Sequence, residues 1–151
     1  GFVKRLFELE IPEINDGTVM LYSVARDAGN RSKVAVYSEN PQVDPIGACI
    51  GEKGSRIARI IEELHGEKLD VVKYDKDPAI FIENALSPAR ELTVAITDPK
   101  KQEAMVIADG DNFSLAIGKK GQNARLASKL THFKIDIKTT EQAREAGINF
   151  R

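Results

Sequence analysis

Two short stretches of this 151-residue sequence combine glycine and lysine in a pattern suited to holding an anion. The first reads Ile-Gly-Glu-Lys-Gly from Ile50, and the second reads Ile-Gly-Lys-Lys-Gly from Ile117. Glycine lets the backbone turn with positive φ and approach a ligand closely, while lysine supplies positive charge. Backbone N–H groups at the start of a following helix also favour an anion. The chemistry expected of both stretches is therefore phosphate binding.

A single stretch of this kind could equally be no more than a tight connection between two helices. Two copies in matching surroundings, both with lysine at the third position after isoleucine, favour a ligand-binding role. Other phosphate motifs do not fit. The sequence has no G-x-x-x-x-G-K-[ST] loop, and "GACIGEKG" has the wrong glycine spacing for a dinucleotide fingerprint. A nucleotide-dependent enzyme is therefore disfavoured.

The residues around the two stretches repeat in one order. Each stretch is followed by a predicted helix and a strand, at 55–64 and 68–74 in the first copy. Each is preceded by a helix, a hairpin and a short second helix. The repeat predicts two α+β modules, with the first domain at 1–76 and the second at 77–151. The second domain is expected to end in a helical tail with Thr140 as its N-terminal cap.

Composition narrows the class of protein further. Hydrophobic residues make up 42% and charged residues 30%, and no apolar run approaches the roughly 18 residues of a membrane span. The single Cys49 allows no internal disulfide and supplies no metal cluster. We therefore expect a cytoplasmic protein without cofactor, metal or membrane contact.

Charge is unevenly distributed although the net charge is only −1. The range 117–138 holds six basic residues and one acidic residue, whereas 77–116 holds three basic and seven acidic residues. Positive charge gathered around one glycine stretch indicates an anionic partner. The acidic range could instead bind protein, which leaves an interaction scaffold with purely structural glycine loops as the alternative function.

An Ile-Gly-x-x-Gly stretch between two helices, followed by a strand, resembles the KH domain, whose GXXG loop clamps nucleic-acid backbone. The order with helix and hairpin first resembles the type II version. The tandem arrangement is similar to the RNA-binding region of the NusA family of bacterial transcription factors. Five segments carry this resemblance: "RLFELEIPEI-DGTV", "VDPIGACIGEKGSRI", "GEKLDVV", "FIENALSPA" and "LAIGKKGQNARLAS".

The resemblance implies two tandem type II KH domains, each a small mixed three-stranded sheet packed against helices. It also implies a non-enzymatic, monomeric chain that binds single-stranded RNA and serves transcription elongation, pausing, termination and antitermination. Members of that family carry further domains before this region. We therefore expect a piece of a longer protein, with RNA polymerase and other transcription factors bound through the full-length protein.

The resemblance also places RNA-binding residues in both modules. In the first they are the apolar floor, the clamp, the first turn of the next helix and the edge strand: Ile50, Gly51, Glu52, Lys53, Gly54, Ser55, Arg56, Leu69, Asp70 and Val71. In the second they are Ile117, Gly118, Lys119, Lys120, Gly121, Gln122, Asn123, Arg125, Ile135, Asp136 and Ile137. Asp70 and Asp136 could equally be structural. The acidic Glu52 is expected to weaken phosphate binding in the first clamp.

Overall fold

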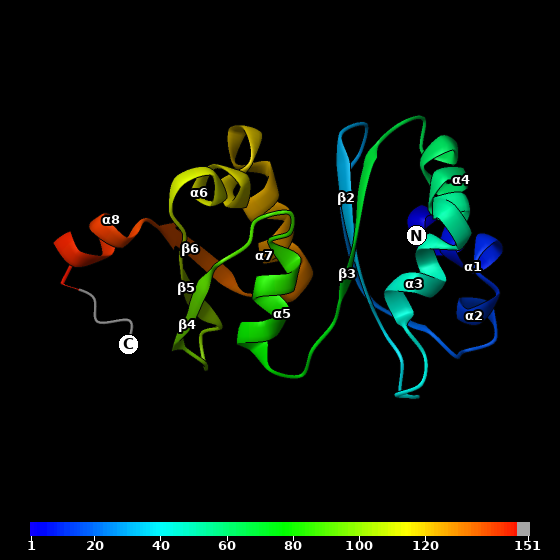
Figure 1. The fold of residues 1–151 in the computed structure, drawn as a ribbon, viewed down its shortest axis with the longest axis horizontal. Helices are drawn as coiled ribbons and strands as arrows, with labels where there is room; N and C mark the ends of the chain where they lie inside the picture. The colour runs from blue at the N-terminus through cyan, green and yellow to red at the C-terminus, as the bar shows by residue number, and fades with distance from the viewer. Residues whose placement is uncertain (148–151) are drawn as a thin grey trace. The chain divides into compact units, whose positions relative to one another are not determined.

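The computed structural model describes residues 1–147 and divides the chain into two compact units, Gly1–Tyr74 and the part from Asp75 onward. Each unit contains one three-stranded sheet with helices packed against it (Figure 1). Both sheets are mixed, because the first two strands pair antiparallel and the third pairs parallel to the second. The predicted fold class, α+β with two small mixed sheets, is confirmed.

The first unit begins with two helices and then alternates strands and helices. Its elements are α1 (Phe2–Glu10), α2 (Pro12–Asn15), β1 (Met20–Asp27), β2 (Arg31–Tyr37), α3 (Pro45–Ile50), the 3-10 turn η1 (Glu52–Gly54), α4 (Ser55–Glu63) and β3 (Lys68–Lys73). The strand order is β1-β2-β3, so β2 is central and β3 forms an edge of the sheet. Asp44 caps α3 by accepting a hydrogen bond from the Ile46 N–H, and Pro45 fits its first turn.

Hydrophobic side chains from the helices and the central strand form the core of the first unit. Phe7 of α1, Ile60 of α4, and Val34 and Val36 of β2 are each 0% exposed. Ile60 follows Ile57 at a helical spacing, so one face of α4 meets the sheet while its charged face stays in water. This packing fixes where α4 begins, and with it the position of the glycine loop.

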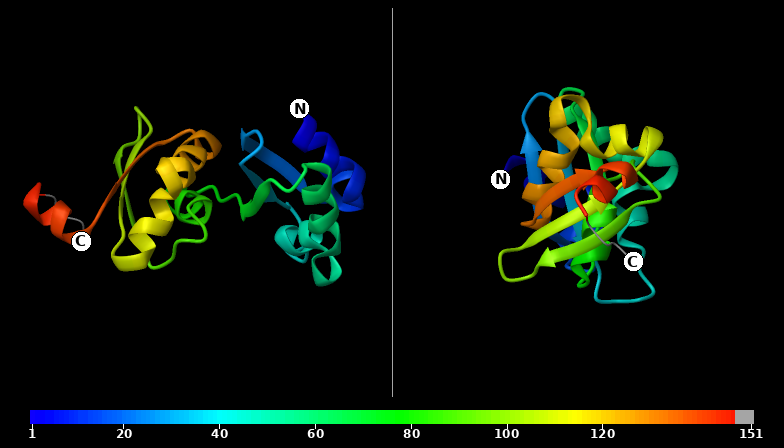
Figure 2. Two further views of the ribbon diagram at one scale, coloured as in Figure 1. Left: turned by 90° about the horizontal axis from the view of Figure 1, so that it is seen from above. Right: turned by 90° about the vertical axis from the view of Figure 1, so that its left-hand side faces the viewer.

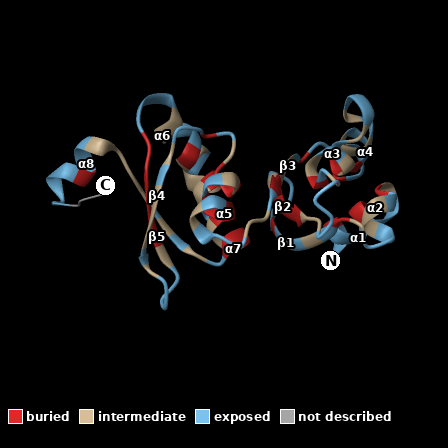
Figure 3. Ribbon diagram, turned by 60° about the horizontal axis from the view of Figure 1, so that its bottom comes forward, coloured by how far each residue is buried: buried red, intermediate tan, exposed pale blue. Residues whose placement is uncertain are grey.

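Up to residue 147, the second unit repeats this order except that it lacks a helix in the place of α2 and adds one helix after its last strand. Its elements are α5 (Pro78–Ala85), β4 (Thr93–Asp98), β5 (Glu103–Ile107), α6 (Gly110–Ile117), the 3-10 turn η2 (Lys119–Gly121), α7 (Gln122–Thr131), β6 (Lys134–Lys138) and α8 (Thr140–Glu145). The strand order is β4-β5-β6, which again leaves the last strand at an edge. Figure 3 shows the central strands β2 and β5 as buried segments.

Helix α8 lies on the sheet face opposite to α5 and α7 (Figures 1 and 2). Ala143 of α8 is 0% exposed and clusters with Met105 and Ile107 of β5. The predicted cap of this helix is wrong by one residue. Thr139 is the N-cap: its hydroxyl accepts from the Gln142 N–H, while the Gln142 side chain accepts from the Thr139 N–H. Thr140 instead bonds Asp109 through its N–H and hydroxyl.

Among residues 1–147, no helix is both long and apolar enough to cross a membrane.

Candidate nucleic-acid interface

The two glycine loops adopt one backbone conformation. Gly51 has φ 77° and ψ 175°, and Gly118 has φ 76° and ψ 173°. Two residues later, Lys53 has φ 54° and ψ 27°, and Lys120 has φ 56° and ψ 27°. Left-handed backbone is uncommon for lysine and costs on the order of 1 kcal/mol. The second loop therefore repeats a specific and strained shape of the first.

Local hydrogen bonds build this shape in both units. The N–H of Gly51 closes the end of α3 on the Gly47 carbonyl at 2.9 Å. The N–H of Gly54 then returns to the Gly51 carbonyl at 3.1 Å. In the second unit the Gly121 N–H bonds the Gly118 carbonyl at the same 3.1 Å. The chain thus leaves one helix and starts the next within four residues.

Helices α4 and α7 begin without a side-chain cap. Their N-cap residues are Gly54 and Gly121, which have no side chain to accept the first N–H groups. The N–H of the first helical residue turns back to the loop in each unit, from Ser55 to the Glu52 carbonyl and from Gln122 to the Lys119 carbonyl. The dipole of each helix favours a negative ligand at its start. Ser55 and Gln122 occupy the first helical positions beside them. The start of each helix is therefore suited to a phosphate oxygen.

The first glycine of each loop is required by close contacts as well as by its φ. A Cβ on Gly51 would lie 2.6 Å from Cγ of Arg56. A Cβ on Gly118 would lie 2.7 Å from Cβ and 2.8 Å from the backbone nitrogen of Asn123. The second clash involves backbone, so it cannot be relieved by turning a side chain.

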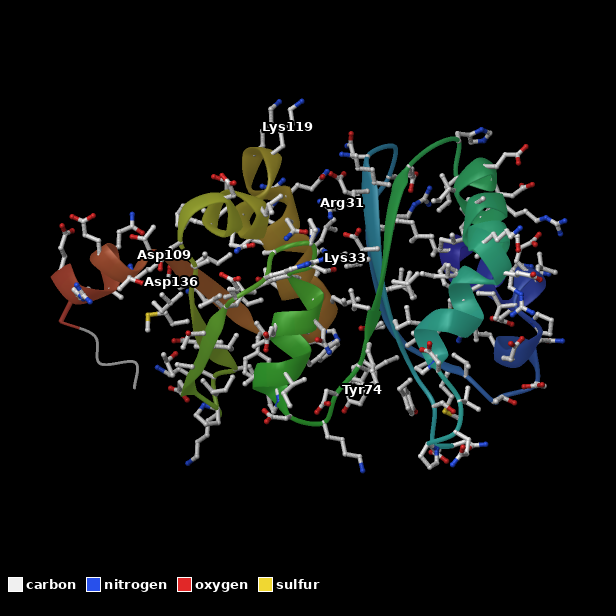
Figure 4. The ribbon with its side chains drawn as sticks, viewed as in Figure 1. Arg31, Lys33, Tyr74, Asp109, Lys119 and Asp136 are labelled. Carbon is white, nitrogen blue, oxygen red and sulfur yellow. The ribbon has the colours of Figure 1, made fainter. Side chains whose placement is uncertain are left out.

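The charged side chains of the loops point into solvent. Glu52, Lys53, Lys119 and Lys120 are all exposed, and Figure 4 shows Lys119 projecting away from its loop. Arg125 is also exposed and donates a hydrogen bond from Nη1 to the Lys120 carbonyl. The second loop therefore presents two lysines beside an arginine. In the first loop, a glutamate stands next to the lysine in the sequence.

Two predicted contact residues point elsewhere. Asn123 is 0% exposed, and its Nδ2 donates to the carbonyls of Leu86, Leu115 and Ala116, each at 3.1 Å. Tertiary packing thus encloses the side chain that was expected to reach RNA, and it presents no polar group to solvent. The Arg56 guanidinium contacts Glu13 and the Ala48 carbonyl.

Apolar side chains lie exposed next to the loops. Ile50 is 37% exposed at the end of α3, and Ile117 is half-buried at the end of α6. Leu115 of α6 is 43% exposed and was not predicted from the sequence. Its position near the end of a short helix before Gly118 was the available signal. These side chains can cover the faces of bases that follow a clamped backbone.

The edge strands β3 and β6 bear the remaining predicted residues. The half-buried Leu69 and Val71 pack against the first core. Asp70 alternates with them, so it lies on the opposite face, within 2.6 Å of Arg31 and 2.8 Å of Lys33. Figure 4 labels both of these β2 residues. These two ion pairs give Asp70 a structural role, and its contact with RNA stays a prediction.

The second edge strand differs from the first. Ile135 and Ile137 are half-buried, while Asp136 between them is 63% exposed and 3.6 Å from Lys138. Asp136 registers with Met105, which packs towards α8. Its carboxylate therefore lies on the α8 side of the sheet (Figure 4), away from the helices that carry the loop.

Neither a metal site nor a reactive thiol is found beside the loops. No group of three metal-ligating side chains occurs in the described part of the chain. Cys49 precedes Ile50 and is 0% exposed, and its burial raises the pKa of the thiol to about 12. The loops thus present exposed lysines and apolar side chains to a ligand.

Each of the two units matches a known domain family. Residues 1–74 match the NusA-like first KH domain, and residues 78–145 match the NusA-like second KH domain. The crystal structure of APE1850 aligns with a TM-score of 0.62 and 25% identity, over 91% of this chain and 96% of that one.

Curated relatives bear the same family name. The chain is 55% identical over 98% of its length to the "Transcription termination/antitermination protein NusA" of Halalkalibacterium halodurans, and equally to that of Bacillus subtilis. It is 50% identical over 92% of its length to the Thermus thermophilus protein. The chain spans 38%, 40% and 36% of these relatives. With both of its units matched in order, the chain belongs to the NusA family, of which it contains the tandem KH domains.

Proposed function

We propose that this chain binds single-stranded RNA through its two glycine loops, as the tandem KH region of a NusA-type transcription factor. The observation that carries the proposal is the repeated loop conformation, with a left-handed lysine and an uncapped helix start in each unit. A purely structural connection has no need for that strain twice, whereas a backbone clamp uses both features.

The proposed site contains the loop glycines and lysines, the first turns of α4 and α7, and the exposed apolar residues before each loop. Phosphates bind at the loops: Gly51, Lys53, Gly54, Ser55, Gly118, Lys119, Lys120, Gly121 and Gln122, with Arg125 beside them. Ile50, Ile117 and Leu115 cover bases, and the edge strands β3 and β6 meet base edges with their backbone. The activity is binding, without catalysis or cofactor.

The name of these relatives refers to termination and antitermination of transcription. We propose that the chain supplies RNA binding to that process in the cytoplasm, as a monomeric region of a longer protein. Contacts with RNA polymerase and other transcription factors belong, in this proposal, to the full-length protein.

The test is charge reversal at the second loop. Lys119→Asp with Lys120→Asp should reduce affinity for a short single-stranded RNA by about 100-fold at low salt, because two attractive charges become repulsive. Adding Lys53→Asp should remove the remaining binding. Exposed loop substitutions change stability by less than about 0.5 kcal/mol, so circular dichroism should show an intact fold.

The matched control is Lys100→Asp with Lys101→Asp, which makes the same charge change in the exposed turn between β4 and β5. An equal loss in the control would indicate general charge repulsion. Unchanged binding in a folded loop variant would leave the interaction scaffold as the better function.

A further inference from the structure

We propose that Arg56 is a positioning residue for the first glycine loop, held in place by Glu13, and does not itself contact the RNA phosphate. This inference rests on the proposed function for two of its three readouts. It concerns three elements of the first unit: α2, which carries Glu13, the end of α3, and the start of α4, which carries Arg56.

One nitrogen of the Arg56 guanidinium makes three hydrogen bonds. Nη1 donates to the Ala48 carbonyl at 2.8 Å and to the two Glu13 carboxylate oxygens at 2.9 and 3.0 Å. The stem of Arg56 lies over Gly51, where a Cβ would sit 2.6 Å from its Cγ. The side chain therefore folds back over the start of the loop and joins α3 to α4.

In the second unit a different side chain makes the equivalent hydrogen bond from the helix after the loop to the helix before it. Asn123 stands five residues after Gly118, as Arg56 stands five residues after Gly51. Asn123 Nδ2 donates to the Leu115 carbonyl at 3.1 Å, and Leu115 precedes its loop by the same three residues as Ala48. The repeated requirement is thus a donor to this carbonyl. A positive charge is not required, since asparagine is neutral and buried.

A hydrogen bond to this carbonyl restricts the orientation of the helix before the loop. The last carbonyls of a helix have no partner within the helix, so an outside donor fixes the direction in which the helix ends. A loop with one orientation of its two helices is ready to bind. A loop that samples several orientations binds more weakly, in proportion to its competent fraction. Losing the hydrogen bond from Arg56 to the Ala48 carbonyl should lower the affinity for RNA without removing a phosphate contact.

The change in RNA affinity caused by Glu13→Gln distinguishes a positioning role for Arg56 from direct contact with phosphate. If Arg56 bound phosphate, Glu13 would compete for it, and Glu13→Gln would strengthen RNA binding. If Arg56 positions the loop, Glu13 orients its guanidinium, and Glu13→Gln weakens binding. The side chains of Arg56 and Glu13 are both 32% exposed, so the substitution removes no core packing.

The matched control is Glu10→Gln, which removes one negative charge from the end of α1. Glu10 lies 3.8 Å from Arg59, whose side chain is 74% exposed. Comparing the two variants in the full chain cancels the general effect of lost negative charge on RNA attraction. We expect Glu13→Gln to bind a short single-stranded RNA about fivefold to tenfold more weakly than Glu10→Gln, as for loss of a charged hydrogen bond. Binding equal to or tighter than Glu10→Gln would overturn the proposal.

Salt dependence and loop protection give independent readings. Arg56→Ala should leave the salt slope unchanged, whereas loss of a direct contact would reduce it by roughly 0.7. Hydrogen exchange at the Gly54 amide, bonded to the Gly51 carbonyl at 3.1 Å, should quicken in Glu13→Gln and Arg56→Ala but not in Glu10→Gln.

The exchange measurement needs no RNA. If the wild-type chain bound no RNA, the proposed function would fail, while exchange would still decide whether Arg56 holds the loop. If Arg56→Ala unfolded the unit, the two glutamate variants would carry the test. Unchanged Gly54 exchange in a folded Glu13→Gln protein would refute the positioning role.

Discussion

Lys53 and Lys120 occupy the same left-handed conformation, with φ within two degrees and the same ψ of 27°. Their neighbours differ: Glu52 precedes Lys53, whereas Lys119 precedes Lys120. The two clamps therefore share a backbone and differ in charge. We therefore expect the two loops to differ in their electrostatic contribution to RNA binding.

The second loop should dominate the salt dependence of RNA binding. Each phosphate neutralised on a single strand contributes roughly 0.7 log units of affinity per log unit of salt. Lys119→Gln with Lys120→Gln should flatten the slope by about 1.4, and Lys53→Gln by less than 0.7. Glu52→Lys should raise affinity at low salt. Binding isotherms at several salt concentrations measure all three, and equal loss of slope from both loops would contradict this assignment.

The two units should bind one RNA strand more tightly together than apart. Residues 75–77 form a short connection between the matched domains, so binding at one loop raises the effective RNA concentration at the other. Isolated units cut after Tyr74 should each bind an RNA long enough for both loops at least about 100-fold more weakly than the whole chain. Circular dichroism must first show that each isolated unit is folded. A single unit that matched the whole chain would rule out joint binding.

Gly118→Ala should destabilise the second unit far more than Gly121→Ala. Gly118 has φ 76° and ψ 173°, a region nearly restricted to glycine, and its added Cβ would meet backbone at 2.8 Å. We expect a loss of about 3 kcal/mol. Gly121 has φ 75° and ψ 11°, which alanine reaches for about 1 kcal/mol, and its Cβ would meet only the flexible end of Arg125. Urea unfolding measures both, and similar losses would show that the close approach is unimportant.

Acid should weaken the first unit through Glu67. The Arg26 guanidinium, 2.8 Å away, holds the pKa of this buried carboxyl below its usual 4.5, aided by the Gly29 N–H at 2.7 Å. A depressed pKa in the folded state gives stability that is present above pH 4.5 and is lost as pH falls through the folded-state pKa. Glu67→Gln should cost about 2 kcal/mol at pH 7 and flatten the fall below pH 4.5.

The control for this acid effect is Glu63→Gln, at an exposed position of α4. Urea unfolding from pH 7 to pH 3 should give a wild-type profile for that variant. An unaltered acid profile in Glu67→Gln would show that another group causes the loss.

The order of elements and both loops could be predicted from the sequence because their signals are local. Apolar spacing at Ile57, Ile60 and Leu64 marks α4, and glycine at 51 and 54 marks positions of positive φ. The duplication supports each assignment twice. The comparisons confirmed the family resemblance, and the structure confirmed the α+β class. The individual RNA contacts stay predictions.

The sequence misplaced one residue and left two others undecided where a polar side chain had two possible partners. Thr139 and Thr140 are both able to cap α8, and the choice depends on Asp109, which binds Thr140 from a distant part of the sequence. Asp70 and Asp136 stand at equivalent strand positions. Only the first has Arg31 and Lys33 beside it, because the second faces Met105. No local pattern encodes these neighbours.

The sequence by itself determined the two modules, their loops and the charge difference between them, since these depend on backbone preference and composition along the chain. Tertiary structure alone decided that Asn123 is enclosed and that Arg56 turns back to Glu13. The physical reason is that a side-chain donor goes to the acceptor that folding places within about 3 Å. For Asn123 that acceptor includes the Leu86 carbonyl, which lies 37 residues away in the sequence.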